Sequence, residues 1–289
     1  MRITDRFPQL PHLLAVSRLD KPIGIYLLLW PTLWALWIAA DGFPGWHLLF
    51  IFVVGTVLTR SAGCIINDIA DRDFDSNVKR TKGRPLATGQ LPLKDALIFM
   101  AVLLILALGL VVTTNMQTVL LAVGAAAVAA VYPVMKRFTY LPQVVLGIAF
   151  SFGIPMSFAA ATNEIPNIAW LMVLANVLWT VAYDTEYAMV DRDDDIRLGI
   201  KSTAILFADM DKLMIGVLQM LFIGILLLLH RHIELGIAFN VGLVAAAGLL
   251  AYQQYLIKDR ERGACFAAFR HNHWVGLAIF IGILTEFGF

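Results

Sequence analysis

The sequence predicts an all-α, polytopic membrane protein in which nine transmembrane helices form one bundle. Of the 289 residues, 60% are hydrophobic and only 15% are charged, and the mean hydropathy is +0.77. A soluble domain is about half apolar and about a quarter charged. The apolar residues also gather in nine long stretches instead of being spread along the chain. Two cysteines and a net charge of +1 do not fit a disulfide-bonded secreted domain or a DNA-binding protein.

Each apolar stretch is long enough to cross a bilayer as a helix, which takes roughly 20 mostly apolar residues. The stretches are continuous, whereas the strands of a membrane barrel alternate apolar and polar residues. Short segments with turn residues, such as 41–45 and 162–166, separate them. The nine expected spans are residues 22–40, 46–66, 96–114, 117–135, 141–161, 168–188, 212–230, 235–256 and 271–289.

The positive charges predict the orientation of these spans. All but two of the 22 Lys and Arg residues, Arg60 and Arg231, lie in segments on one side of the membrane. Because Lys and Arg favour cytoplasmic loops, we expect the N-terminus inside and the C-terminus outside. Segment 1–21 lacks the apolar core of a signal peptide, and we expect it to form an interfacial helix.

Ten of the 21 acidic residues lie in two short segments at the inner ends of the second and sixth spans. On a helix, residues three, four and seven apart share one face. In the first segment this face holds Asn67, Asp68, Asp71 and Asp75. In the second it holds Asp184, Tyr187, Asp191 and Asp195. Two such clusters are hard to interpret as solvated loop charges alone.

Carboxylates crowded on one helix face repel one another unless a positive charge neutralises them. Mg²⁺ prefers oxygen ligands and is often held by one or two carboxylates together with substrate phosphates. Two facing acidic clusters would therefore suit a diphosphate bridged by Mg²⁺ ions. Asp191 and Asp195 follow Asp71 and Asp75 by the same 120 residues. This offset predicts an internal repeat of two helix sets about an axis normal to the membrane.

A basic run, Lys79 to Arg84, follows the first acidic segment. Its residues could set the topology next to anionic lipids, or at least one of them could contact the diphosphate. The histidines form no HExxH pattern, and no P-loop, GxSxG or GxGxxG motif is present.

The pattern Asn67-Asp68-x-x-Asp71-x-x-x-Asp75, together with Asp191-x-x-x-Asp195, resembles the UbiA superfamily of membrane prenyltransferases. Segments 18–24, 132–143 and 183–203 resemble in particular the bacterial members that prenylate 4-hydroxybenzoate early in ubiquinone biosynthesis. The resemblance covers nearly the whole chain. It implies a single domain, residues 1–289, with a central cavity, cytoplasmic active-site loops at 67–94 and 184–211, and a place in the bacterial cell inner membrane.

The resemblance also implies the roles of the charged residues. Mg²⁺ would be held by Asp68, Asp71, Asp75, Asp191 and Asp195, of which Asp71, Asp75, Asp191 and Asp195 would be catalytic. Asn67 would assist, and Arg72, Lys79, Arg84 and Lys201 would stabilise the departing diphosphate. Tyr187 is expected in the substrate site, and Arg137 is expected to hold the benzoate carboxylate. Asp191 is our candidate for the proton acceptor. The partners would be polyprenyl diphosphate, 4-hydroxybenzoate and the bilayer, with no nucleic acid.

Three alternatives remain open at this point. The acceptor could be another one used in the superfamily, such as a naphthoate, homogentisate, haem or a glycerol lipid. An ion-coupled transporter would also use paired carboxylates, but more often near the bilayer midplane at broken helices. A phospholipid-headgroup transferase would be expected to carry its Asp residues in one motif, not 120 residues apart.

Overall fold

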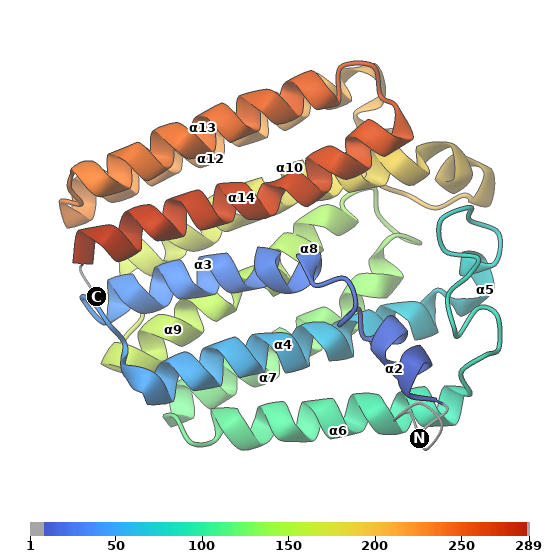
Figure 1. The fold of residues 1–289 in the computed structure, drawn as a ribbon, viewed down its shortest axis with the longest axis horizontal. Coiled ribbons are helices and arrows are strands. Elements are labelled where there is room, and N and C mark those ends of the chain that lie inside the picture. Colours follow the sequence, from blue (N-terminus) through green and yellow to red (C-terminus); the bar gives the residue numbers. More distant parts are fainter. Residues whose placement is uncertain (1–8, 288–289) are drawn as a thin grey trace, which may run out of the picture.

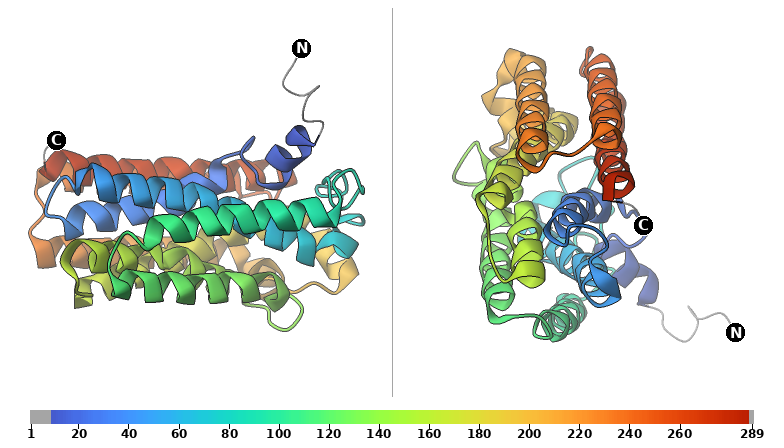
Figure 2. Two further views of the ribbon diagram at one scale, coloured as in Figure 1. Left: turned by 90° about the horizontal axis from the view of Figure 1, so that it is seen from below. Right: turned by 90° about the vertical axis from the view of Figure 1, so that its left-hand side faces the viewer.

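The computed structural model describes residues 9–287, so our expectation for residues 1–8 lies outside the described residues. Within this part of the chain all regular structure is helical, and long helices run side by side as one bundle (Figures 1 and 2). The all-α prediction is confirmed.

The helices of the first half are α2 (Leu10–Val16), α3 (Ile23–Ala39), α4 (Gly45–Ala70), α5 (Arg72–Asp75), α6 (Leu93–Val111) and α7 (Met116–Met135). The second half contains α8 (Pro142–Ser151), α9 (Gly153–Thr162), α10 (Asn167–Leu198), α11 (Thr203–Leu206), the 3₁₀ turn η1 (Ala208–Met210), α12 (Asp211–Ile233), α13 (Ile237–Leu256) and α14 (Arg262–Phe287).

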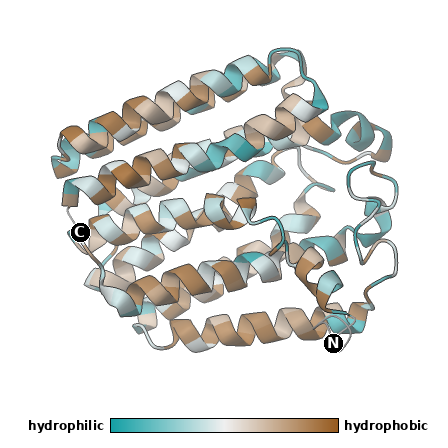
Figure 3. Ribbon diagram, in the orientation of Figure 1, coloured by the Kyte–Doolittle hydropathy of each residue, from teal (hydrophilic) through white to brown (hydrophobic). Residues whose placement is uncertain are grey.

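Seven segments of the described chain are helical, long enough and apolar enough to cross a membrane. They are α4, α6, α7, α8 with α9, α10, α12 with η1, and α13. The chain is therefore a multi-pass membrane protein. Hydrophobic colours dominate most of these helices, whereas hydrophilic ones gather in the connecting segments at the right-hand end of Figure 3. The other two expected spans correspond to α3, which is apolar but 17 residues long, and to α14, which carries Arg270, His271 and His273 in its first half.

The expected span 141–161 is divided into two short helices, α8 and α9. Pro155, in the first turn of α9, has no backbone N–H to donate to the carbonyl of Ser151, and its ring clashes with that carbonyl in a continuous helix. At the same residue, the Ser151 hydroxyl donates a hydrogen bond to the Gly147 carbonyl and accepts one from Asn176. The break is thus a local effect of one proline.

Aromatic rings form the centre of the bundle. Trp34 of α3, Trp179 of α10 and Phe222 of α12 are almost completely buried, and the ring of Trp179 lies 5.5 Å from each of the other two. The indole N–H groups of these two tryptophans have partners, since Trp34 donates to the Gly276 carbonyl and Trp179 donates to Asn272. Such partners are needed where no water can reach.

The inner ends of α4 and α10 lie at the same end of the bundle, on the right in Figure 1. The short helix α5 and the irregular segment 76–92 also lie there. Helix α10 continues to Leu198, so the acidic residues expected in a loop at 184–211 lie on a helix as far as Asp195. The fold therefore brings together the ends of two helices that are far apart in sequence.

Candidate active site

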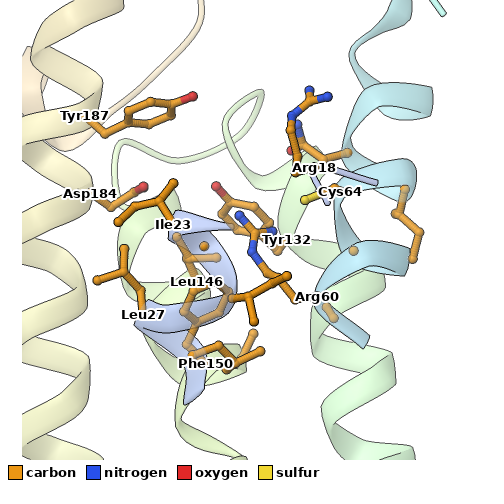
Figure 4. Close-up of a pocket in the computed structure, with 18 of the residues that line it drawn as sticks. Arg18, Ile23, Leu27, Arg60, Cys64, Tyr132, Leu146, Phe150, Asp184 and Tyr187 are labelled. Carbon is orange, nitrogen blue, oxygen red and sulfur yellow. The ribbon is translucent and has the colours of Figure 1, made fainter. Parts of the chain in front are cut away.

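A cavity of about 1800 Å³ opens inside the bundle. Its walls come from α3, α4, α7, α8, α10 and α14, and segment 76–92 contributes at the inner end. Charged residues line the inner end, while apolar and aromatic side chains line the deeper part, where Leu27, Leu146 and Phe150 lie (Figure 4). The cavity thus offers two chemically different environments.

The first acidic cluster lies where α4 ends. Asp68 is 1% exposed and accepts two hydrogen bonds of 2.9 Å from Arg18, and it lies 3.0 Å from Arg84. Asp71 follows the last residue of α4 and accepts a hydrogen bond of 3.1 Å from Asn67. Asp71 also pairs with Lys136, which follows the end of α7.

Asp75 completes the first cluster at the end of α5, where it pairs with Arg84 at 2.8 Å. Arg84 therefore lies between Asp68 and Asp75 and holds the two carboxylates together. Burial disfavours the charged form of Arg84, but the attraction of these two carboxylates outweighs that penalty and raises its pKa. The guanidinium stays charged.

The second cluster lies on the last turns of α10. Asp191 and Asp195 both line the cavity, one helical turn apart. Asp191 pairs with Arg80 of segment 76–92 at 2.6 Å, and the guanidinium carbon of Arg80 lies 4.6 Å from the centre of the Tyr187 ring. Asp195 has no ion pair within residues 9–287.

The first cluster contains donor atoms that suit a divalent cation. In the described part of the chain, no group of three or more His, Cys, Asp or Glu residues forms a ready-made metal cage. The Oδ1 atom of Asp71, however, is buried and has no hydrogen-bond partner among the described residues. Burial raises the pKa of Asp71, and Lys136 offsets this shift only in part. Carboxylate oxygens that lack a full set of partners fit Mg²⁺, which takes its remaining ligands from water or phosphate.

Most of the expected site residues line this cavity: Asn67, Asp68, Asp71, Asp75, Arg84, Tyr187, Asp191, Asp195 and Lys201. Lys201 also donates a hydrogen bond of 3.1 Å to the Phe138 carbonyl. The cavity lining does not include Arg72, Lys79 or Arg137. Arg72 pairs with the exposed Asp73, and Arg137 donates to the carbonyl of Ala70 at the end of α4.

Seven Lys and Arg residues on the cavity wall were absent from our expected site: Arg18, Lys21, Arg60, Arg80, Lys136, Arg262 and Arg270. Arg80 belongs to the basic run that suggested a diphosphate contact, and Lys136 is next to Arg137 in sequence. Arg60 carried the clearest signal, because it is a charged residue within an apolar span and such residues are usually functional.

Arg60 lies in the deeper part of the cavity, seven residues before Asn67 on the same helix. Seven residues of α-helix correspond to about 10 Å along the axis. Its guanidinium carbon is 5.3 Å from the centre of the Phe150 ring, and its Nε is buried without a hydrogen-bond partner among residues 9–287. Figure 4 shows Arg60 beside Tyr132, with Asp184 and Tyr187 projecting from α10 across the cavity. No carboxylate of the described chain forms an ion pair with Arg60.

The profile of the UbiA prenyltransferase family matches residues 28–276, which is most of the chain. The chain belongs to the UbiA prenyltransferase family. The resemblance inferred from the two acidic motifs is thereby confirmed. Both motifs and Arg60 lie inside the matched region.

Curated relatives in this UbiA family are similar over nearly their whole length. The 4-hydroxybenzoate octaprenyltransferase of Pseudomonas aeruginosa is 58% identical over 270 residues, which cover 93% of this chain and 91% of that protein. The protein of the same name from Saccharophagus degradans is 56% identical and covers 94% of this chain and 91% of its own length.

Solved structures of UbiA homologues share the fold. The apo structure from Aeropyrum pernix K1 superposes with a TM-score of 0.80 at 24% identity and covers 90% of this chain and 97% of that one. A homologue from Archaeoglobus fulgidus, solved bound to GPP and Mg²⁺, gives a TM-score of 0.69 at 17% identity. The match covers 95% of this chain and 99% of that one.

Proposed function

We propose that this chain transfers a polyprenyl group from polyprenyl diphosphate to the 3-position of 4-hydroxybenzoate and releases diphosphate, an early step of ubiquinone biosynthesis. The observation that carries this proposal is one cavity with two separate charged sites. A cluster of paired carboxylates and cations lies at its inner end, and Arg60 lies about two helical turns deeper in an apolar wall. The names of relatives at 55–58% identity support the choice of acceptor and donor.

The inner cluster would bind the diphosphate together with Mg²⁺. Asn67, Asp68, Asp71 and Asp75 from α4 and α5, with Asp191 and Asp195 from α10, would supply the oxygen ligands. The cation would supply positive charge to the diphosphate oxygens. Arg18, Arg80, Arg84 and Lys136 now pair with these carboxylates. The diphosphate would draw the same four cations to itself and so gain electrostatic stabilisation as it departs. Arg72, Lys79 and Lys201 stay proposed as outer contacts of that anion.

The deeper part of the cavity would protect the allylic cation that remains after the C–O bond breaks. Water would capture such a cation, so the walls must exclude it. Tyr132, Phe150, Tyr183 and Tyr187 line this region, and aromatic faces stabilise positive charge. The apolar side chains around them have no groups that could react with the cation.

Arg60 would hold the carboxylate of 4-hydroxybenzoate. A guanidinium without a carboxylate partner in an apolar setting favours an anion, and its planar fork matches a carboxylate. We prefer Arg60 to Arg137 for this role, because Arg60 lines the cavity and Arg137 is absent from its lining. A ring anchored at Arg60 would point its hydroxyl end towards the diphosphate site, where the carbon next to the hydroxyl would meet the prenyl cation.

The bond changes then balance. The C–O bond of the diphosphate breaks, a C–C bond forms, and the ring carbon loses its proton. Three carboxylates of α10 line the cavity: Asp191 and Asp195 in the cluster, and Asp184 two turns deeper than Asp191. Asp195 lies one further turn towards the inner end of α10, away from a ring anchored at Arg60. Asp191 is engaged by Arg80, whereas Asp184 faces Arg60 and Tyr132 across the cavity (Figure 4). We therefore move the proposed base from Asp191 to Asp184.

The other acceptors and classes are less well supported. Homogentisate and the propionates of haem are carboxylates too, so Arg60 alone does not distinguish these acceptors from the benzoate. A naphthoate would use Arg60 equally well, and here the relatives' names favour the benzoate. An ion-coupled transporter would need no cavity of this volume between two acidic clusters.

We propose the following membrane arrangement. The chain, a single domain, has nine spans, with α3 and α14 added to the seven apolar segments. The N-terminus and the acidic clusters lie on the cytoplasmic side of the bacterial inner membrane, and the C-terminus lies outside. The positive charges at the inner end support this orientation. The matching acidic ends of α4 and α10 support two related helix sets.

The direct test uses purified protein in nanodiscs with octaprenyl diphosphate, 4-hydroxybenzoate and Mg²⁺. Mass spectrometry should detect the 3-prenylated acid, and product should disappear when the metal is chelated. The absence of product with several prenyl chain lengths would overturn the proposal. Product formed equally well from 1,4-dihydroxy-2-naphthoate would overturn the choice of acceptor.

A further inference from the structure

Gly24, near the start of α3, is the last residue of the N-terminal motif at 18–24, and the proposed mechanism gives it no role. The other end of this motif, Arg18, pairs with Asp68 in the acidic cluster. Glycine is among the poorest helix formers. Its presence inside the first turns of a membrane helix therefore needs a packing reason.

The reason lies in the contact between Gly24 and Arg60. A Cβ atom at residue 24 would lie 2.6 Å from Nε, 2.7 Å from Nη2 and 3.0 Å from Cζ of Arg60. All three atoms belong to the guanidinium group, so this group packs directly on the backbone of α3. Carbon and nitrogen atoms that are not bonded to each other do not approach this closely, and any larger residue at 24 must move the guanidinium.

The guanidinium also faces a second element. The Phe150 ring of α8 lies 5.3 Å from its Cζ atom. Contacts with α3 and α8 together limit where the head of a long, flexible side chain can lie. In the described chain, no hydrogen bond from Arg60 to a carboxylate holds the guanidinium in place.

We propose that Gly24 is a positioning residue: by lacking a side chain, it places the Arg60 guanidinium for the carboxylate of an aromatic acid and so determines the enzyme's preference for acidic acceptors. This inference rests on the proposed function of Arg60. The atoms that a Cβ would meet form the end of a flexible side chain. Gly24→Ala should therefore displace Arg60 without unfolding the bundle.

The displacement has a selective consequence. The acceptor loses its charged anchor, whereas the carboxylates and cations of the inner cluster stay in place. We expect Gly24→Ala to raise the KM for 4-hydroxybenzoate about tenfold and to leave the KM for the prenyl diphosphate within about twofold. The preference for 4-hydroxybenzoate over the uncharged 4-hydroxybenzamide should fall by about the same tenfold factor.

The experiment compares four proteins in nanodiscs: wild type, Gly24→Ala, Arg60→Ala and the double variant. Gly248→Ala is the matched control, since it also adds a methyl group to a helical glycine but meets nothing within 4 Å. Both KM values are measured, together with binding of radiolabelled 4-hydroxybenzoate without metal or diphosphate. If Gly24 acts through Arg60, Gly24→Ala should have no further effect once Arg60 is alanine.

The outcomes separate the two proposals. Equal KM increases for both substrates, or the same tenfold effect in the Arg60→Ala background, would overturn the positioning role of Gly24. An unchanged acceptor KM in Gly24→Ala would also overturn it. If Arg60→Ala does not weaken 4-hydroxybenzoate binding, the assignment of Arg60 fails. If the wild type makes no prenylated benzoate, the proposed function itself fails.

Discussion

The guanidinium of Arg80 donates three hydrogen bonds to the carboxylate of Asp191, two from Nε at 3.0 and 3.2 Å and one from Nη2 at 2.6 Å. The pair joins segment 76–92 to α10 across the inner end of the cavity. Because Asp191 is also a proposed ligand of Mg²⁺, Arg80 and the metal would compete for the same oxygen atoms.

This competition predicts that Arg80→Gln binds a divalent metal more tightly than wild type when no diphosphate is present. The gain should be about three- to tenfold, since a partly exposed ion pair contributes on the order of 1 kcal/mol. Titration with Mn²⁺ followed by electron paramagnetic resonance measures it. Lys82→Gln removes an equal charge from the same segment but not from the cavity lining, and it should not change the affinity. An unchanged Mn²⁺ affinity in Arg80→Gln would show that the pair does not block the metal.

The acidic segment of α4 and α5 contains its own control. Asp71→Asn should reduce turnover at least about a thousandfold, because a proposed metal ligand at the centre of the cluster is lost. Asp73 lies two residues away, but its side chain is 84% exposed and, among the described residues, pairs with Arg72. Asp73→Asn should keep near-normal activity. The two variants are compared by product formation and by thermal unfolding, which should be similar for both. Retained activity in Asp71→Asn would remove this residue from the site.

Substitution of Arg60 and substitution of Arg137 should have different effects on the KM for the acceptor. Arg60→Ala should raise the KM for 4-hydroxybenzoate about tenfold or more, as expected when a charged hydrogen bond in an apolar pocket is lost. Arg137→Ala should affect both substrates alike, since Arg137 donates to the backbone carbonyl of Ala70, beside the acidic cluster. Steady-state kinetics with each substrate varied in turn distinguishes the two residues. A selective acceptor defect in Arg137→Ala would restore our original assignment.

The sequence predicted the helical bundle and both acidic clusters because these features are local. A run of apolar residues indicates a membrane helix, and carboxylates three or four residues apart share one helix face, whatever the rest of the fold is. The partners of the carboxylates could not be predicted in this way. Arg18 and Lys136 reach the first cluster only through packing of α2 and α7 against α4, and Arg80 reaches Asp191 from 111 residues away. The break between α8 and α9 at Phe152 was not predicted, although its cause, Pro155, is visible in the sequence.

A buried polar network that no sequence pattern indicated predicts a separate effect on stability. Glu186 of α10 is fully buried and accepts a hydrogen bond of 2.9 Å from Asn272 of α14, which in turn accepts one from Trp179. Gln219 of α12 lies 3.4 Å from the other carboxylate oxygen. None of these four side chains lines the cavity, so the network stabilises the packing of α10, α12 and α14 and does not touch the substrates.

Glu186→Leu should therefore lower the free energy of unfolding by about 1–2 kcal/mol, because the buried amide groups of Asn272 and Gln219 each lose one of their two acceptors. Glu186→Gln keeps an acceptor oxygen in the same place. It should lower the free energy of unfolding by less than half as much as Glu186→Leu does. Thermal unfolding in detergent measures the difference, and both KM values should stay within about twofold of wild type at temperatures where the variants are folded. A Leu variant that is as stable as the Gln variant would mean that side-chain volume, not hydrogen bonding, determines the packing at this position.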